Sequence, residues 1–330
     1  AVMLPPMAIF FPIFTILEDL GYLPRVAFNL DWLFKRAGAH GKQALSMAMG
    51  FGCNAAGVIS TRVIDSPRER LIAILTNNFV PCNGRFPTLI MLATVFVAAS
   101  FSPAVSSFIA AGAVLLVVLI GVFFTLLMSW ILSKTVLKGE ASAFTLELPP
   151  YRKPNFVRIL YTSLIDRTIF VLWRALKTAA PAGAVIWILA NINLNGVSLA
   201  REIANFLNPF GLLLGLDGVI LLAYIIAIPA NEIVVPTMMM VYTGVGRMTE
   251  VTGFDQIRAI LIGANGWTML TAVNFMLFSL LHNPCATTIW TIYKETRSAK
   301  WTVLSVVMTL GTAFLVTFLT ASLARLLGWV

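Results

Sequence analysis

Long apolar runs separated by short polar segments extend along almost the whole chain. The runs at 104–132 and from about 301 to 327 are long enough to cross a bilayer, which takes about 20 apolar residues in a helix. At 27–37, an apolar group ends in Lys35 and Arg36, which predicts an interfacial helix. The other predicted helical or apolar segments lie at 2–17, 43–49, 55–64, 68–79, 86–100, 155–178, 179–190, 199–214, 218–228, 233–242, 254–263, 267–281 and 286–293. This pattern predicts an all-α, polytopic transmembrane protein.

Four of the apolar runs are broken in the same way, by Gly or Pro followed by a polar or thiol residue, after which an apolar helix resumes. The breaks lie at 50–54, 81–84, 229–232 and 282–285, and the residues that cause them are Gly50, Gly52, Pro81, Pro229 and Pro284. A broken helix leaves backbone groups unsatisfied, which costs several kcal/mol for each group in hydrocarbon. Secondary transporters place substrates at such breaks. The glycines would let the backbone leave the helix and approach an ion closely.

The breaks also suggest that the chain is internally duplicated. Two breaks lie in each half, and a short echo supports the repeat: Asn77 follows Arg70 by seven residues, and Asn265 follows Arg258 by seven, each across an apolar stretch. Inverted repeats of this kind are common in transporters. The predicted division is a first half at 1–137, a cytoplasmic loop at 138–155 and a second half at 156–330.

The composition supports a membrane protein and excludes a soluble globular one. Hydrophobic residues make up 59% of the chain and charged residues 11%, and the mean hydropathy is +0.89. Soluble domains carry about 25% charged residues, so the expected surroundings are a lipid bilayer. The formal net charge is +9, but no basic run is long enough for a nucleic-acid footprint. The basic residues between Lys134 and Arg158 instead predict a cytoplasmic loop.

The sequence gives little support to an enzyme. It contains no phosphate-binding loop of the form G-x-x-x-x-G-K-[ST], no H-E-x-x-H and no G-x-S-x-G. We therefore expect this region to have neither a catalytic site nor a bound organic cofactor. The chain opens part-way along an apolar run and without Met, so we expect it to be a piece of a longer protein.

The candidate chemistry lies in the three cysteines. Cys53, Cys82 and Cys285 fall at three of the four breaks. Isolated thiols in membrane helices are usually small apolar fillers. Amide and carboxylate oxygens alone would suit a nucleoside, an amino acid or a hard cation, whereas thiols at the breaks favour a borderline-soft transition metal.

Three carboxylates and two amides complete the candidate set. Glu232 lies inside an apolar region, where a charged side chain is a functional candidate, although pairing with an arginine at the interface is an alternative. Glu18 and Asp19 are adjacent and so cannot face the same way on a helix; a structural pair with Arg25 is as plausible as function. The asparagines that adjoin the thiol and the carboxylate, Asn54 and Asn231, complete the predicted pathway lining.

Taken together, the motifs resemble a known family. LEDLGYLPRVAF, GFGCNAAGVISTR, SPRERLIAIL, PCNGRFP, LKGEASAFTLELPPYRKPN, ANEIVVP and HNPCATTIWTIYKET follow one another along the chain. This series is similar to the membrane region of bacterial ferrous iron transport protein B. The family has two Gate-type segments related to nucleoside-transporter gates, which an N-terminal GTP-binding domain precedes in full-length members. Ala55 and Ala56 stand where the family usually has Val-Pro.

The resemblance implies a permease of the bacterial inner membrane that moves Fe²⁺ into the cytoplasm. It implies that Cys53, Cys82 and Cys285 handle the ion, and it matches Glu18, Asp19 and Glu232 to family motifs. The expected partners are the GTPase domain, small Feo accessory proteins and other copies of the chain. One alternative is a Gate-type transporter of a nucleoside or another small organic solute. Another is a structural or regulatory membrane scaffold.

Overall fold

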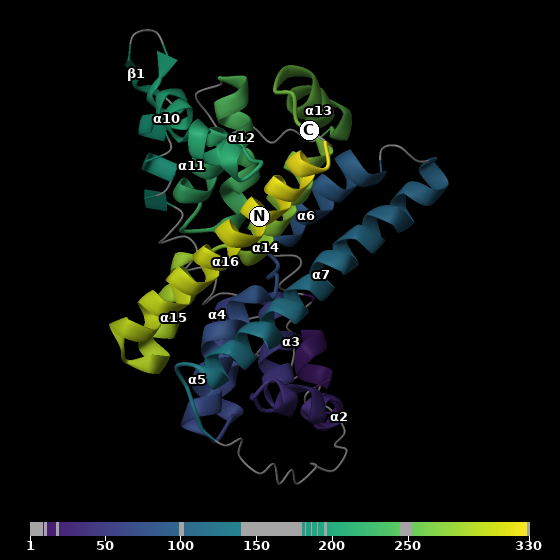
Figure 1. Cartoon of the computed structure of the whole chain (residues 1–330), viewed down its shortest axis with the longest axis vertical. Coiled ribbons are helices and arrows are strands. Elements are labelled where there is room, and N and C mark those ends of the chain that lie inside the picture. Colours follow the sequence, from purple (N-terminus) through teal and green to yellow (C-terminus); the bar gives the residue numbers. More distant parts are fainter. Residues whose placement is uncertain are drawn as a thin grey trace. The chain divides into compact units, whose positions relative to one another are not determined.

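The computed structural model describes residues 12–17, 20–98, 102–139, 197–244 and 253–328, together with residue 9 and short pieces between 180 and 194. Most of these residues are helical (Figure 1). In this described part of the chain the only strands are β1 (Asn193–Leu194) and β2 (Val197–Ser198), which pair antiparallel. The predicted all-α class is therefore confirmed. Glu18, Asp19, the predicted segment at 155–178 and most of the loop at 138–155 lie outside the described residues.

Three described segments are long and apolar enough to cross a membrane: Val105–Lys134, Met269–Thr296 and Ala299–Leu326. A fourth span is formed if Leu199–Leu213 and Gly218–Ile226, which are bent by 111°, are counted as one. The first of these segments belongs to α7 (Pro103–Lys134), which exposes large apolar side chains such as Phe108 and Leu116. Such a surface is unfavourable in water and favourable in lipid. The chain is a multi-pass membrane protein.

The described helices divide into two compact units that are discontinuous in sequence. The first unit spans Ala1–Gly84, Ile120–Leu176 and Thr287–Val307. Its described elements are α2 (Tyr22–Arg36), α3 (Gln43–Gly52), α4 (Asn54–Ser60), η1 (Thr61–Val63), α5 (Pro67–Thr76), η2 (Asn77–Phe79) and α15 (Ala286–Thr296). Ser66 caps α5, because its side chain accepts from the Glu69 N–H at 3.4 Å, and Pro67 occupies the first turn.

The second unit spans Arg85–Leu119, Lys177–Ala286 and Met308–Val330. Its described helices are α6 (Phe86–Leu92), η3 (Ala93–Val97), α10 (Leu199–Leu213), α11 (Gly218–Ile226), η6 (Asn231–Ile233), α12 (Val234–Thr243), α13 (Phe254–Arg258), η7 (Ala259–Ala264) and α14 (Met269–Leu281). Asp217 caps α11 by accepting from the Ile220 N–H at 2.8 Å. Of the two long helices, α7 begins in the second unit and ends in the first, whereas α16 (Ala299–Leu326) begins in the first and ends in the second.

Each unit contains helical segments from the opposite half of the chain. Helix α15 comes late in the sequence, yet Ile292 packs with Val58 and Ile74 in the core of the first unit. Helix α6 comes early, yet it packs against α14 in the second unit. The exchange is reciprocal, as a duplicated chain would allow. The predicted division into halves at 1–137 and 156–330 stays a prediction.

Candidate functional site: the paired helix breaks

The first break is one extended residue between two helices. Helix α3 ends at Gly52, Cys53 has φ −155° and ψ 123°, and α4 begins at Asn54. The Cys53 backbone stays satisfied on both sides, because its N–H donates to the Met49 carbonyl at 3.0 Å and its carbonyl accepts from the Gly57 N–H at 2.9 Å. The thiol is partly buried. The break therefore presents a side chain without leaving the Cys53 peptide groups unpaired.

Gly50 has a different role from the one that the sequence suggests. It lies inside α3, and a Cβ at this position would come within 3.0 Å of the Asn77 Oδ1. A Cβ on Gly57 would lie 2.6 Å from the Asn77 Nδ2. The Asn77 amide fits between the two glycines and donates to the Asn54 carbonyl at 3.2 Å. These glycines make room for a buried amide.

The Asn54 side chain braces the first break against the second. It is 3% exposed and contacts the Asn78 amide at 3.1 Å. With its nitrogen facing the neighbouring acceptors, the Asn54 amide donates to the carbonyls of Gly50 and Val80, each at 3.2 Å. A carbonyl near the end of α3 and one beside Pro81 are thereby held by one side chain.

The second break lies between η2 and α6 and contains Pro81 and Cys82. The N–H of Asn83 donates to the Gly52 carbonyl at 3.4 Å, so the backbones of the two breaks run side by side within the first unit. Cys82, like Cys53, is a partly buried thiol. The first unit thus brings two of the predicted thiol-bearing segments together.

The third break repeats the backbone of the first. Ala230 has φ −155° and ψ 115°, close to the values of Cys53, and it precedes an asparagine, Asn231, that is 6% exposed. Glu232 follows in η6 and is partly exposed. The two breaks therefore share an extended residue followed by a buried asparagine. They differ in that α11 already ends at Ile226 and a 3-10 helix follows, in that a methyl group replaces the thiol, and in that the next residue but one is a carboxylate.

The fourth break is hydrogen-bonded to the third through the backbone, just as the second break is hydrogen-bonded to the first. It lies between α14 and α15 and contains Pro284 and Cys285. The N–H of Ala286 donates to the Ile228 carbonyl at 2.8 Å. In each unit, then, the residue after a cysteine donates to a backbone carbonyl of the other break: Asn83 to the last residue of α3, and Ala286 to Ile228, two residues beyond the end of α11. The second unit brings the Cys285 segment beside the Glu232 segment.

Arg85 holds the fourth break, and sequence reasoning did not single it out. Its side chain is 1% exposed and donates to the carbonyls of Leu280 at 2.7 Å, His282 at 3.0 Å and Asn283 at 3.3 Å. These carbonyls lie at the C-terminus of α14, where helical partners are missing and a positive charge is favourable. The signal that could have found Arg85 is a lone arginine at the start of an apolar run.

The described residues form no ready-made metal cage. Among them, no group of three His, Cys, Asp or Glu side chains is close enough to hold one ion. Cys53 and Cys82 belong to the first unit, whereas Glu232 and Cys285 belong to the second, and all three cysteines remain thiols rather than disulfides.

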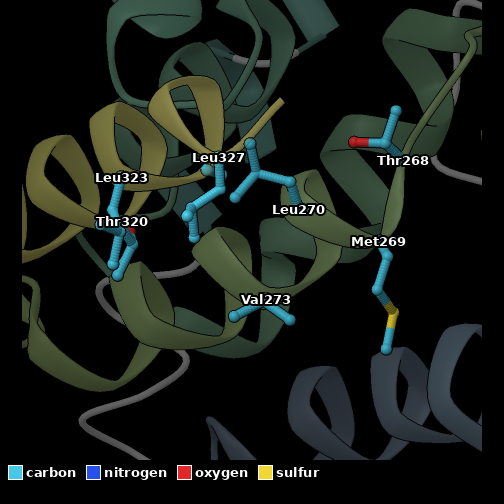
Figure 2. Close-up of a pocket in the computed structure, with 8 residues that line it drawn as sticks. Thr268, Met269, Leu270, Val273, Thr320, Leu323 and Leu327 are labelled. Carbon is cyan, nitrogen blue, oxygen red and sulfur yellow. The ribbon is translucent and has the colours of Figure 1, made fainter. Parts of the chain in front are cut away.

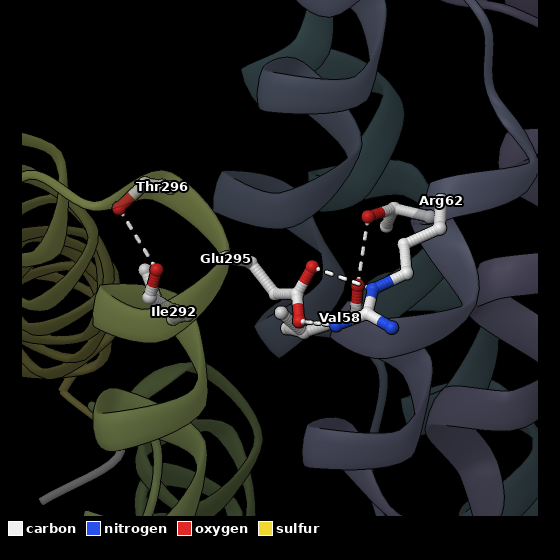
Figure 3. Close-up of polar contacts among 6 residues, drawn as sticks. Val58, Arg62, Ile292, Glu295 and Thr296 are labelled. Atoms are coloured by element: carbon white, nitrogen blue, oxygen red, sulfur yellow. Dashed lines mark hydrogen bonds and ion pairs between the residues drawn. The ribbon is translucent and has the colours of Figure 1, made fainter.

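An ion pair anchors the far end of α15 in the first unit (Figure 3). Arg62 donates to both carboxylate oxygens of Glu295, at 2.6 and 2.9 Å. This bidentate geometry is the strongest form of an arginine–carboxylate contact. The Arg62 side chain is 65% exposed, so the pair contributes only about 0–1 kcal/mol to the attachment of α15, the helix that follows the Cys285 break.

A cavity of about 290 Å³ lies on the second unit (Figure 2). It is bounded by the first half of α14 and the C-terminal part of α16, and Met269, Val273 and Leu323 are among the lining residues. The lining is mostly aliphatic, and it includes none of the predicted site residues. The cavity therefore offers neither thiol nor carboxylate ligands.

Two family models match the sequence. The Gate model, described as nucleoside recognition, matches residues 1–96 and 172–299, which is more than half of the chain. A second model, described as the C terminus of ferrous iron transport protein B, matches residues 114–166. No solved structure gives a significant match.

Curated relatives match nearly the whole chain. An Fe(2+) transporter FeoB of Staphylococcus aureus is 30% identical over 329 residues, which is 96% of this chain and 46% of the relative. An Fe(2+) transporter FeoB of Synechocystis is 30% identical over 98% of this chain and 50% of its own length. An Fe(2+) transport protein A/Fe(2+) transporter FeoB fusion protein of Porphyromonas gingivalis is 26% identical over 96% of this chain and 42% of its own length. The chain spans about half the length of the curated relatives it matches.

Proposed function

This chain belongs to the Gate family, and we propose that it is the permease region through which a bacterial transporter moves Fe²⁺ across the inner membrane. The names of the relatives support Fe²⁺ as the substrate, because the similarity extends over almost all of this chain. The observation that carries the proposal is the pairing of helix breaks: each unit joins two breaks by a backbone hydrogen bond, and each pair includes at least one partly buried thiol.

The ligand chemistry of the breaks suits a borderline metal ion. Thiolates bind Fe²⁺ better than they bind hard cations, and carboxylate and amide oxygens can replace the hydration water of the ion. We assign the main pathway to Cys53, Cys285 and Glu232, with Cys82 as a further lining residue. Conduction requires binding strong enough to admit the ion and weak enough to release it, which pairs of ligands provide.

The remaining predicted residues have supporting roles in the proposal. Asn54 acts through its contacts with the backbones of both breaks, and Asn231 occupies the matching position in the second unit. Glu18 and Asp19, as the family resemblance implies, belong to the pathway in the segment before α2. No residue of this region is assigned a catalytic role.

We further propose that the full-length protein has an N-terminal GTPase domain, which drives or gates the permease. An accessory Feo protein is a further proposed partner, supported by the relative in which transport protein A and the transporter form one chain. Formation of a homo-oligomer is also part of the proposal.

The proposal is tested by Fe²⁺ flux. The full-length protein is reconstituted into liposomes that contain a fluorophore quenched by Fe²⁺, under anaerobic reducing conditions, with empty liposomes as the control. We expect time-dependent quenching that exceeds the leak of empty liposomes. Quenching no faster than that leak, from protein shown to be folded, would overturn the proposal.

A second candidate function is transport of a nucleoside, because the matching family model is described as nucleoside recognition. Buried amides such as Asn77 and Asn231 could hydrogen-bond a nucleobase or ribose. This candidate predicts a rise in melting temperature with added nucleoside and none with Fe²⁺. The iron proposal predicts the reverse, so one thermal-shift series with both ligands separates the two.

A further inference from the structure

One face of α3 carries a line of polar residues that leads to the Cys53 break. Gln43, Ser46 and Gly50 follow one another at intervals of three and four residues, which places them on the same side of the helix, and Cys53 is the first residue beyond its end. Gln43 is 1% exposed and Ser46 is fully buried. Polar side chains therefore continue inside the unit from the start of α3 to its broken end.

Three other elements, α5, η2 and α7, complete this line with hydroxyl and amide groups. The Gln43 Nε2 donates to the Thr76 Oγ1 of α5 at 2.9 Å and lies 3.3 Å from the Ser129 Oγ of α7. The Ser129 hydroxyl donates to the Thr125 carbonyl at 2.8 Å, and its oxygen lies 3.4 Å from the Thr76 Oγ1. Asn77 follows Thr76, and its amide fills the space beside Gly50. We call Gln43, Ser46, Thr76, Asn77 and Ser129 the polar seam; all five are 1% exposed or less.

The polar seam has spare hydrogen-bonding capacity. Within the residues that the structure describes, Gln43 Oε1, Ser46 Oγ and Asn77 Oδ1 are buried without a hydrogen-bond partner. A buried polar atom left without a partner costs about 1–3 kcal/mol, and an apolar residue of the same shape avoids this cost. Three such atoms along one line point to a ligand that supplies the missing contacts.

The two ends of the polar seam have different chemistry. One end is the thiol of Cys53. At the other end lie His40, before α3, and Glu69, at the start of α5. These side chains are 5% and 1% exposed. Lys42, next to His40, and Lys134, at the end of α7, mark this end as cytoplasmic.

We propose that the polar seam is a hydrated route along which a divalent cation passes between the Cys53 break and the cytoplasmic side. This inference rests on the proposed transport of Fe²⁺. Neutral amide and hydroxyl oxygens can share the hydration shell of the ion, and none of the five side chains carries a charge that would trap it. The route gives an ion that leaves the thiol a path into water without crossing the apolar core.

Flux measurements test the route with variants that remove polar atoms and keep the fold. In the liposome assay, Gln43→Leu and Ser46→Ala are each compared with Thr125→Val. Thr125, on α7, is the matched control. It is fully buried, as Ser46 is, but its hydroxyl has a partner because it donates to the Gly121 carbonyl at 2.9 Å. We expect Gln43→Leu to lower the Fe²⁺ flux about tenfold, or about 1.4 kcal/mol in the barrier. Ser46→Ala lowers it less, and Thr125→Val leaves it unchanged.

Melting temperature separates the route from a structural role. Because the Ser46 hydroxyl has no partner, Ser46→Ala is expected to melt at the wild-type temperature or above it. Wild-type flux in both seam variants would overturn the inference. A loss of flux that is matched by a loss of folded protein would also overturn it.

Accessibility to a water-soluble reagent gives a readout that does not depend on iron transport. In a background with Cys53, Cys82 and Cys285 replaced by Ala, Ser46→Cys is treated with a charged methanethiosulfonate. Thr125→Cys in the same background is the control. We expect the first variant to react and the second to remain unreactive; no reaction at Ser46→Cys would overturn the inference. If the protein moves no Fe²⁺ but Ser46→Cys reacts, the proposed substrate fails while the hydrated seam stands.

Discussion

The backbone N–H of Ala286 donates to the carbonyl of Ile228 at 2.8 Å, so the residue after Cys285 is fixed beside the segment that leads to Glu232. The equivalent bond in the first unit joins Asn83 to Gly52. Each unit therefore holds two broken helices together through their own backbones. Ligand positions at the breaks depend on these bonds and on the side chains that support them.

Replacing Arg85 should loosen the fourth break. Arg85→Met leaves the carbonyls of Leu280, His282 and Asn283 without their charged donor, and we expect a loss of several kcal/mol in unfolding free energy. Arg85→Lys keeps the charge but not the planar fork, so partial recovery is expected. The measurements are the melting temperature in detergent and the rate at which Cys285 reacts with a thiol reagent.

Arg258→Gln serves as the control for Arg85, because Arg258 is an exposed arginine on α13 in the same unit. We expect neither measurement to change in this variant. If Arg85→Met had the wild-type melting temperature and the wild-type rate of Cys285 modification, Arg85 would not support the fourth break.

Gly57→Ala should disturb the first break. Its Cβ would lie 2.6 Å from the Asn77 amide and 2.9 Å from the Ser46 carbonyl, and overpacking of this kind costs about 1–3 kcal/mol. Gly112→Ala and Gly311→Ala are matched controls, since these helical glycines on α7 and α16 have nothing within 4 Å of the added atom. There, alanine should be neutral or slightly stabilising. Equal melting temperatures for all three variants would contradict the packing around Asn77.

His40 should make the stability of the first unit depend on pH. It lies in the loop between α2 and α3, and burial lowers its pKa, although the negative charge of Glu69 acts in the opposite direction. The Nδ1 accepts from the Lys42 N–H at 3.0 Å, a contact that the protonated ring cannot make at that atom.

The sign of the effect follows from this lowered pKa. The unfolded chain takes up a proton at His40 at higher pH than the folded chain does, so stability is full above the ordinary histidine pKa of about 6.5 and falls as the pH drops below it. His40→Gln should flatten the dependence of melting temperature on pH between about 7.5 and 5.5. An unchanged slope would show that His40 is not the group responsible.

The sequence was sufficient to predict the all-α class, the membrane class and most of the described helices, because apolar periodicity and Gly and Pro residues act locally. The segment predicted at 68–79 is an example, since it corresponds to α5 and η2. The exchange of α6 and α15 between units could not be predicted, because it depends on packing between distant segments. Arg85 shows the same limit: its acceptor at Leu280 is 195 residues away. Gly50 was recognised as special, but only the structure reveals that its neighbour is Asn77.

The most direct test of the proposed thiol pathway is the rate of Fe²⁺ uptake by liposomes containing the full-length protein with Cys53→Ser or Cys285→Ser. Because serine keeps the size of the side chain but removes the softer ligand, we expect each change to slow uptake about tenfold, or about 1.4 kcal/mol in the barrier, at an unchanged melting temperature. Cys82→Ser should have a smaller effect. Wild-type uptake by both of the first two variants would contradict the pathway.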